Sequence, residues 1–364
     1  MTHRDATDGR TSLSGLPAVW HDDCLLHEPQ GEVWLGIWEA GTEVPERAVV
    51  LLDALRSAGA AITSATAHAD AAILAVHDAG FVEYLATAWD QWETGRYRSR
   101  HGRQRVVPYV FPTAGLLSGL PVRSPAALHG RVGRFCYDTM TLVGPGTWEA
   151  AKAAADAALT AVDLVAGGAP AAYALCRPPG HHAGPAAHGG SCYLNNSAIA
   201  AQALRDAGAA RVAVLDIDAH HGNGTQAIFY TRDDVYVGSV HVDPGAGWFP
   251  HYVGYGEERG TGEGTGANRN LPLAPGTGDR EWLAAVDVLC GDVRDRGTDA
   301  VVVSLGLDAA ASDPESPLEV SADGYRQAMT QIAGLAPALV VQEGGYDLST
   351  LGPLAVAALE GLQA

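Results

Sequence analysis

The hydrophobic pattern of the chain is a series of short apolar runs, each of which ends in polar residues. The run from Val212 to Leu215 is followed by Asp216, Asp218 and His220. Continuous apolar runs of this length are typical of strands buried on both faces of a parallel sheet. Further runs of this kind are Pro17 to Trp20, Tyr173 to Cys176, Val235 to Val240, Ala300 to Leu305 and Ala338 to Val341.

Helical patterns alternate with these runs. They lie between Pro45 and Gly59, from Ala71 to Ala88, between Gly146 and Gly167, from Ser197 to Ala207 and from Glu281 to Arg296. Alternating strands and helices imply right-handed crossovers and a mainly parallel sheet covered on both faces. We therefore predict an α/β fold, with a single domain over residues 16–364 and a polar, disordered tail over residues 1–15.

The composition is that of an ordinary globular protein, with 47% hydrophobic and 18% charged residues. No apolar run approaches the roughly 18 to 20 residues of a membrane span, and the N-terminus has no apolar segment for secretion. The five cysteines are scattered, which favours reduced thiols. A formal net charge of −19 would repel nucleic acid phosphates. These features predict a cytoplasmic protein with no membrane or nucleic acid partner.

The polar residues after the apolar runs predict a metal site. The carboxyl ends of parallel strands meet at one edge of a sheet, so these residues should converge there. Asp218 and His220 can offer a carboxylate oxygen and an imidazole nitrogen to the same divalent ion. Asp308, after the run Ala300 to Leu305, is the expected third ligand. Three ligands leave one position of Zn2+ open for water, which suits hydrolysis.

Two structural interpretations compete with the metal site. The polar residues after Leu215 could form a hydrogen-bonded cluster at a strand end, and Asp308 could cap the segment that follows it.

The adjacent residues His181 and His182 lie in a Pro-Pro-Gly turn and are candidates for general base and general acid. Asp216 could orient one imidazole and Asn223 the other. An aspartate partner raises the basicity of an imidazole more than an asparagine partner, so the two histidines could divide the roles. Tyr346, after a Gly-Gly pair, is a candidate hydroxyl donor to an oxyanion.

Four motifs, in the order RPPGHHAG, DIDAHHGNGT, SLGLD and EGGYDL, resemble those of the zinc-dependent histone deacetylase superfamily. The segments VHDAGFVEYLATAWDQW and PGTWEAA are most similar to its class II-like and acetylpolyamine amidohydrolase branch. The resemblance extends over roughly residues 17–360. It implies the three-layer arginase/deacetylase-like fold, with a central, mainly parallel sheet flanked by helices.

The resemblance also implies a role for each site residue. The catalytic residues would be His181 and His182, their partners Asp216 and Asn223, and the carbonyl-polarising Tyr346. The zinc ligands would be Asp218, His220 and Asp308, which Fe2+ also fits. A structural K+ would be held by Asp216, Asp218, His220, Ser239 and Val240.

The segment expected to line the substrate channel departs from the family pattern. Where family members carry an aromatic wall residue, this chain has Ser191. The pocket is then wider there, or Tyr193 or another loop supplies the wall. The expected substrate-binding residues are Asp138, Gly190, Ser191 and Cys192.

Asp138 stands where lysine deacetylases carry an aspartate that grips substrate amides; the alternative is a solvated loop residue. Asp138 is also the only acid in a loop with Arg131 and Arg134, which disfavours a polyamine. The segment around Trp89 resembles one that supports a dimer in polyamine enzymes, and this suggests a homodimer.

We therefore predict a zinc-dependent amidohydrolase that removes an acetyl or short acyl group from an amine, with a small acetylated amine such as an acetylpolyamine preferred. The alternatives are a protein or peptide N-acetyl-lysine deacetylase and a deacetylase of an acetylated natural product. A binuclear manganese ureohydrolase is disfavoured because Gly222 occupies a position that needs a bridging aspartate. A non-catalytic ligand binder is disfavoured because the metal ligands and Tyr346 are all present.

Overall fold

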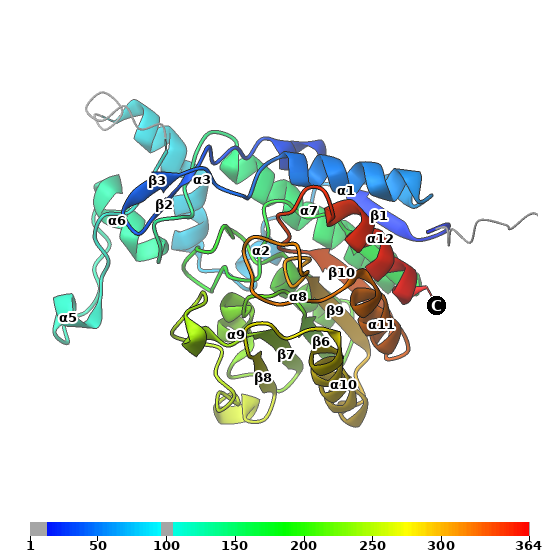
Figure 1. Cartoon of the computed structure of the whole chain (residues 1–364). Coiled ribbons are helices and arrows are strands. Elements are labelled where there is room, and N and C mark those ends of the chain that lie inside the picture. Colours follow the sequence, from blue (N-terminus) through cyan, green and yellow to red (C-terminus); the bar gives the residue numbers. More distant parts are fainter. Residues whose placement is uncertain (1–12, 96–104, 364) are drawn as a thin grey trace, which may run out of the picture.

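The computed structural model describes residues 13–95 and 105–363. Its centre is an eight-stranded sheet in which every neighbouring pair of strands is parallel (Figure 1). In spatial order the strands are β4 (Ala61–Ser64), β1 (Pro17–Trp20), β5 (Ala171–Ala174), β10 (Ala338–Gln342), β9 (Ala300–Leu305), β6 (Val212–Asp216), β7 (Val235–Val242) and β8 (Asn268–Leu273). A separate antiparallel hairpin pairs β2 (Glu32–Trp34) with β3 (Ile37–Glu39).

The five strands that carry the expected site residues are neighbours in the sheet, in the order β5-β10-β9-β6-β7. Every residue of β6, β7, β9 and β10 is buried, as their apolar sequences require. In the register of the sheet Asp216 lies between Ser304 on β9 and Ser239 on β7. The carboxyl ends of the strands are therefore level, and the segments after them meet at one edge.

Two rows of helices flank the sheet (Figure 1). The first row is α7 (Thr147–Ala166) and α8 (Asn196–Asp206), which contact each other and, between them, β1, β5, β6, β9 and β10. The second row is α1 (Glu46–Ser57), α12 (Leu351–Leu362), α11 (Ala322–Ala333) and α10 (Asp279–Arg296), packed side by side in that order. The predicted three-layer arrangement is confirmed.

The remaining α-helices lie outside these two rows (Figure 1). They are α2 (Ala71–Leu74), α3 (Ala79–Thr94), α5 (Ala114–Leu117), α6 (Leu128–Phe135) and α9 (Asn223–Phe229). An aromatic cluster that includes Phe81, Tyr84 and Phe135 joins α3 to α6. The His188 ring stacks on this cluster, which brings the segment before Gly189 against the end of α6.

Most predicted elements are present, but two differ. The strand expected at Tyr173 to Cys176 is β5, two residues earlier, because the chain leaves the sheet before Arg177-Pro178. The helix expected from Ala71 to Ala88 is interrupted between α2 and α3, where Asp78 caps α3 by accepting hydrogen bonds from two main-chain N–H groups. The edge strands β4 and β8 were not predicted from the sequence.

The predicted N-terminal tail needs a correction at its inner end. Leu13 is fully buried in the core, and its N–H donates to the carbonyl of Ala58. The packed chain therefore includes residues 13–15, while residues 1–12 lie outside the described part. Among the described residues, no helix combines the length and apolar character needed to cross a membrane.

Candidate active site

The expected metal ligands come together beyond the ends of β6 and β9. The side chains of Asp218, His220 and Asp308 each offer a ligand atom, and these atoms all lie within 4.8 Å of one another. Nδ1 of His220 is 3.0 Å from Oδ2 of Asp308 and 3.4 Å from Oδ1 of Asp218. Both carboxylates are buried. Two carboxylate oxygens and one imidazole nitrogen match the donor set of a catalytic zinc site.

The charges in this cluster favour a bound cation. Burial and the negative charge of Asp218 raise the pKa of the Asp308 carboxyl to about 7. Two ionised carboxylates at this spacing repel each other in a poorly hydrated place, and a divalent ion would relieve that repulsion.

Two glycines leave room for these carboxylates. A Cβ at Gly306 would lie 2.0 Å from Oδ2 of Asp218, and a Cβ at Gly344 would lie 2.4 Å from Oδ2 of Asp308. The N–H of Gly344 also donates to Oδ2 of Asp218 over 2.8 Å. A side chain at either glycine would push a carboxylate out of place. The two glycines therefore allow the carboxylates to converge, and the residues present fit a metal ion.

The imidazole of His220 is oriented by a second contact. Its Nε2 lies 3.1 Å from the carbonyl oxygen of Glu315, which can only accept a hydrogen bond. Nε2 therefore carries a proton. Burial opposes a second proton on the ring, but the carboxylates of Asp218 and Asp308 outweigh it and raise the His220 pKa well above its usual value. A metal ion bound by these carboxylates would take the place of the proton on Nδ1.

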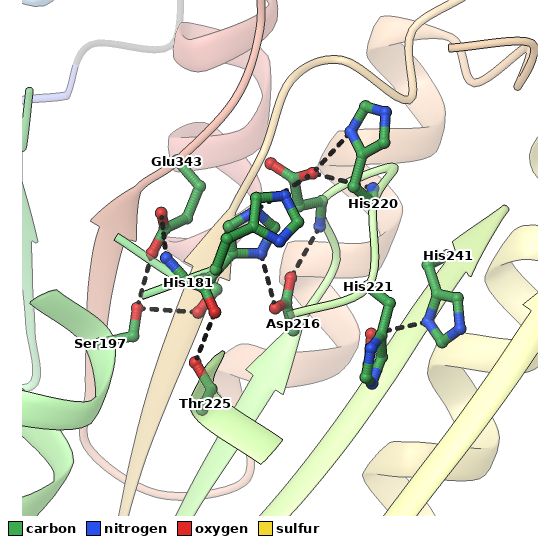
Figure 2. A network of polar contacts seen from close by, with 12 residues as sticks. His181, Ser197, Asp216, His220, His221, Thr225, His241 and Glu343 are labelled. Carbon is green, nitrogen blue, oxygen red and sulfur yellow. Dashed lines mark hydrogen bonds and ion pairs between the residues drawn. The ribbon is translucent and has the colours of Figure 1, made fainter. Parts of the chain in front are cut away.

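The paired histidines lie beside this cluster. Nε2 of His181 is 3.7 Å from Oδ1 of Asp218, and Figure 2 shows His181 next to Asp216. Nδ1 of His181 is 2.9 Å from Oδ2 of Asp216, and Nδ1 of His182 is 2.7 Å from Oδ1 of Asn223. The centroids of the two rings are 3.9 Å apart. The structure thus brings together the two histidine-partner pairs that the sequence predicts.

The two imidazoles differ in basicity. Burial opposes protonation of His181, but the carboxylates of Asp218 and Asp216 outweigh it and raise its pKa to about 10. Burial and the positive charge of His181 hold the pKa of His182 well below its usual value. At neutral pH the first ring is therefore protonated and the second is neutral.

Tyr346 is held after the end of β10 by two groups. Its N–H donates to Oδ2 of Asp313 over 2.6 Å, and the guanidinium of Arg47 lies 4.7 Å from the centroid of its ring. Burial raises the pKa of the Tyr346 phenol well above its usual value, although Arg47 opposes this. The phenol therefore stays protonated and can donate a hydrogen bond.

The expected rim residues form a tightly bonded turn. The Asp138 carboxylate accepts hydrogen bonds from the N–H groups of Met140, Thr141 and Gly190 and from the Thr141 hydroxyl. The N–H of Ser191 donates to the Thr141 hydroxyl. All the usual acceptor positions of the carboxylate are thus filled from within the protein.

The remaining predicted site residues lie in the same region. Cys192 is fully buried, and its Sγ lies within 4.8 Å of a ring nitrogen of His181 and a carboxylate oxygen of Glu343. Ser239, expected near K+, is paired with Asp216 in the sheet and hydrogen-bonds Nδ1 of His241 over 2.8 Å. Val240, the next residue, is buried.

Comparison with known proteins decides the family. A model of the histone deacetylase domain matches residues 41–362. The chain belongs to the histone deacetylase family. Acetylpolyamine amidohydrolase 1 of Pseudomonas aeruginosa is 40% identical to it, with 95% of this chain and 98% of that protein covered. Acetylpolyamine amidohydrolase of Mycoplana ramosa is 39% identical, with 95% and 99% covered.

A solved structure supports the same assignment. The crystal structure of an acetylpolyamine aminohydrolase from Burkholderia pseudomallei superposes with a TM-score of 0.89 at 39% identity, covering 96% of this chain and 99% of that one. The predictions of a histone deacetylase fold and of a metal-dependent hydrolase of this family are confirmed.

The sequence analysis of this histone deacetylase family member did not predict the contacts of two aromatic residues, Tyr137 and Phe249. The rings of Tyr137 and Phe249 are nearly parallel, at 17°, with centroids 6.3 Å apart. Phe249 contacts the His182 ring edge-on, and the Tyr137 hydroxyl donates to the His182 carbonyl oxygen. The sequence could not show this, because the two rings come from loops more than a hundred residues apart.

A buried ionic cluster was missed as well. The Glu43 carboxylate accepts hydrogen bonds from Arg47 and Arg177, and all three side chains are buried. Arg47 also donates to the carbonyl oxygens of Glu343 and Gly345. The only sequence signal was that charged residues stand within otherwise apolar segments.

Proposed function

We propose that the chain is a zinc-dependent deacetylase of small acetylated amines, with acetylpolyamines as the preferred class. The observation that carries the proposal is the position of the His181 and His182 pair against the cluster of Asp218, His220 and Asp308. The relatives at about 40% identity over nearly the whole chain are named for acetylpolyamine hydrolysis, which supports this substrate class.

The cofactor that fits this donor set is Zn2+, held by Asp218, His220 and Asp308, and Fe2+ fits the same ligands. When bound, such an ion polarises a carbonyl group and makes water more acidic. The proposed K+ residues are Asp216, Asp218, His220, Ser239 and Val240, near the paired strands β6 and β7.

The two histidines divide the proton transfers. The carbonyl oxygen of Asn223 can only accept, so Nδ1 of neutral His182 carries the proton and its Nε2 is free to take one from water. The hydroxide so formed adds to the acetyl carbon, and the Tyr346 phenol donates a hydrogen bond to the developing oxyanion. His182 then returns the proton to the amine nitrogen as the C–N bond breaks, which gives acetate and the free amine.

His181 does not need to give up its proton in this scheme. The Asp216 carboxylate accepts a hydrogen bond from its Nδ1, which favours the positively charged ring. A fixed positive charge next to His182 stabilises the negative charge of the intermediate and keeps the His182 pKa low.

Acidic side chains near the site support a cationic substrate. Burial and the charges of Glu315, Asp138 and Glu39 raise the pKa of Glu32 to about 7, so these carboxylates share one electrostatic environment. The main-chain oxygen of Glu315 contacts His220, so this group of acidic residues lies next to the metal ligands. The sequence showed only one of these acids in the rim loop, because Glu32 and Glu39 come from the separate β2–β3 hairpin. Their charges favour binding of an ammonium group.

We further propose that Tyr137 and Phe249 flank the acetylated arm of the substrate, so that Tyr137 replaces the missing aromatic at Ser191. Tyr137 is 37% exposed and its ring lies against Gly189, where a Cβ would approach within 2.3 Å. Tyr137→Ala should raise KM about tenfold with little change in kcat, as expected when burial of an apolar arm is lost. An unchanged KM would contradict the assignment; Phe249→Ala is the matched variant.

The direct test of the function is hydrolysis of N-acetylputrescine, N8-acetylspermidine and an acetyl-lysine peptide, with metal analysis of the same sample. We expect turnover of the acetylpolyamines and a loss of at least about 100-fold in His182→Ala, which lacks the proton carrier. Preference for the peptide would replace the small-amine proposal with the lysine deacetylase alternative. Zinc binding without any turnover would contradict both and favour an acetylated natural product or simple ligand binding.

A homodimer remains a prediction, since residues 96–104 of the relevant segment lie outside the described residues. Sedimentation velocity of the full chain would test it: a single species of monomer mass at all concentrations would contradict a dimer.

A further inference from the structure

A buried carboxylate that the reaction scheme does not use lies behind the paired histidines. Glu343, the residue after β10, has no exposed surface. Its Oε2 accepts hydrogen bonds from the N–H groups of Gly180, over 2.7 Å, and His181, over 3.1 Å. Figure 2 shows the carboxylate beside the main chain of His181, with Ser197 on its other side.

No cation of the described residues forms a direct ion pair with this carboxylate, although a ring nitrogen of His181 lies within 4.8 Å of it. Within residues 13–95 and 105–363, no Lys, Arg or His nitrogen forms an ion pair with its oxygens, and Arg47 reaches only the main-chain oxygen of Glu343. A buried carboxylate is unfavourable unless hydrogen bonds replace its water. Here the replacement comes from the turn that carries the histidines.

The second oxygen is held by a chain of hydroxyl groups. Oε1 accepts from the Ser197 hydroxyl over 2.9 Å, and the Ser304 hydroxyl donates to Ser197 over 2.8 Å. Ser197 lies in the first turn of α8 and Ser304 lies on β9. Both oxygens of Glu343 are thus fixed by rigid elements.

The turn itself has no room to move toward α8. A Cβ at Gly180 would lie 2.5 Å from the nitrogen of Asn196, so the turn already lies against α8. From the other side, the His181 carbonyl accepts from the N–H groups of Gly224 and Thr225 at the start of α9. Glu343 supplies the contact from β10.

The following residue connects Glu343 to the metal ligands. The N–H of Gly344 donates to Oδ2 of Asp218, and Tyr346 follows two residues later. The segment from Glu343 to Tyr346 therefore contacts the histidine turn and a metal ligand, and it carries the phenol. We propose that Glu343 is a positioning residue that sets the distance between the paired histidines and the metal cluster; this rests on the hydrolase function proposed above.

The contact with the turn requires one oxygen that accepts two hydrogen bonds, and it does not require a negative charge. In Glu343→Gln, the amide oxygen can accept from Gly180 and His181, while the NH2 group donates to Ser197, whose hydroxyl can turn toward Ser304. In Glu343→Ala both N–H groups lose their partner, and the turn is free to shift. A displacement of about 1 Å of catalytic groups can cost about 100-fold in rate.

The test compares these two variants with wild type on N8-acetylspermidine. We expect Glu343→Ala to lower kcat about 100-fold with KM within about threefold and zinc content unchanged, and Glu343→Gln to stay within about fivefold of wild type. Asp156→Asn is the matched control, because Asp156 is a buried carboxylate on α7 that accepts from a main-chain N–H outside the site. It should keep wild-type kcat.

A spectroscopic measurement separates this proposal from the proposed function. The proton NMR signals of the Nδ1–H groups of His181 and His182 report their bonds to Asp216 and Asn223, whether or not a substrate has been found. We expect both to shift in Glu343→Ala and to recover in Glu343→Gln. Unchanged signals in Glu343→Ala, or a Glu343→Gln variant as slow as Glu343→Ala, would overturn the positioning role. Absence of turnover in wild type with these shifts present would overturn only the substrate assignment.

Discussion

The metal site has no space for a side chain at two of its glycines. Asp218 and Asp308 lie so close to the main chain of Gly306 and Gly344 that no side chain fits at either glycine. The N–H of Gly344 donates a hydrogen bond to Asp218, and the N–H of Ala219 donates one to Asp308. Binding of the metal therefore depends on residues that are not themselves ligands.

We expect Gly344→Ala to weaken zinc binding about 10- to 100-fold while all three ligands remain, which is the usual loss when the groups supporting metal ligands are disturbed. The added Cβ would approach Oδ2 of both Asp308 and Asp218. Competition with a chromophoric chelator measures the affinity. Gly291→Ala on α10 is the control, since no atom of the described residues other than its chain neighbours and its own helix lies within 4 Å of the new Cβ. Equal affinity in the two variants would contradict the prediction.

The pairing of His182 with an amide predicts a specific pH profile. Asn223→Asp would place a carboxylate 2.7 Å from Nδ1 and raise the His182 pKa, by about one to three units for a close opposite charge. The base must be neutral to act, so activity is lost as the pH falls through this pKa. The acidic limb of kcat/KM should therefore move to higher pH. A profile of the variant that overlays the wild type would show that His182 is not the base.

At the scale of elements, the β2–β3 hairpin brings acids to the site that belong to no catalytic motif. Glu32 and Glu39 face each other in the hairpin register, and the main chain of Val33 pairs with Thr139 beside Asp138. The hairpin is thereby fixed against the rim turn. Its charges should influence both stability and substrate binding.

Glu32→Gln should make the protein more stable above about pH 7 and leave its stability near pH 4.5 unchanged. The folded-state pKa of Glu32 is about 7, raised from 4.5, so folding disfavours the ionised form and wild-type stability falls as the pH rises between these values. The same change should raise KM for N8-acetylspermidine. Thermal unfolding at the two pH values measures the first effect. A variant with no gain above pH 7 would contradict the assignment, and Glu83→Gln, an exposed acid on α3, is the control.

Elements and site residues could be predicted wherever the pattern lies within one short segment of the sequence. The run Val212 to Leu215 predicted β6 because a strand buried on both faces is apolar throughout, and the residues that follow it gave the metal ligands. The edge strand β8 reads NRNLPL, and its half-exposed positions carry no such run. The partners of Tyr137 and Glu343 were not predictable, because contacts between distant segments depend on the order of strands in the sheet.

At the scale of the whole molecule, the net charge of −19 should steer cationic substrates toward the protein. Between about 0.02 M and 0.3 M salt, screening shortens the range of these charges several-fold. We expect kcat/KM for N8-acetylspermidine to fall severalfold over this range and kcat to change little. A neutral acetylated amine is the control substrate; an equal fall for both would show that charge plays no part in capture.

The position of β10 has a consequence for biosynthesis. Of the described strands β10 is the last in sequence, yet it lies between β5 and β9 in the middle of the sheet. Synthesis proceeds from the N-terminus, so the nascent chain presents two unjoined half-sheets with open edges until this strand emerges. Glu343, Gly344 and Tyr346 arrive with it. Catalytic competence is therefore acquired in one late step, and a nascent chain paused before β10 would be a client for chaperones rather than a partly active enzyme.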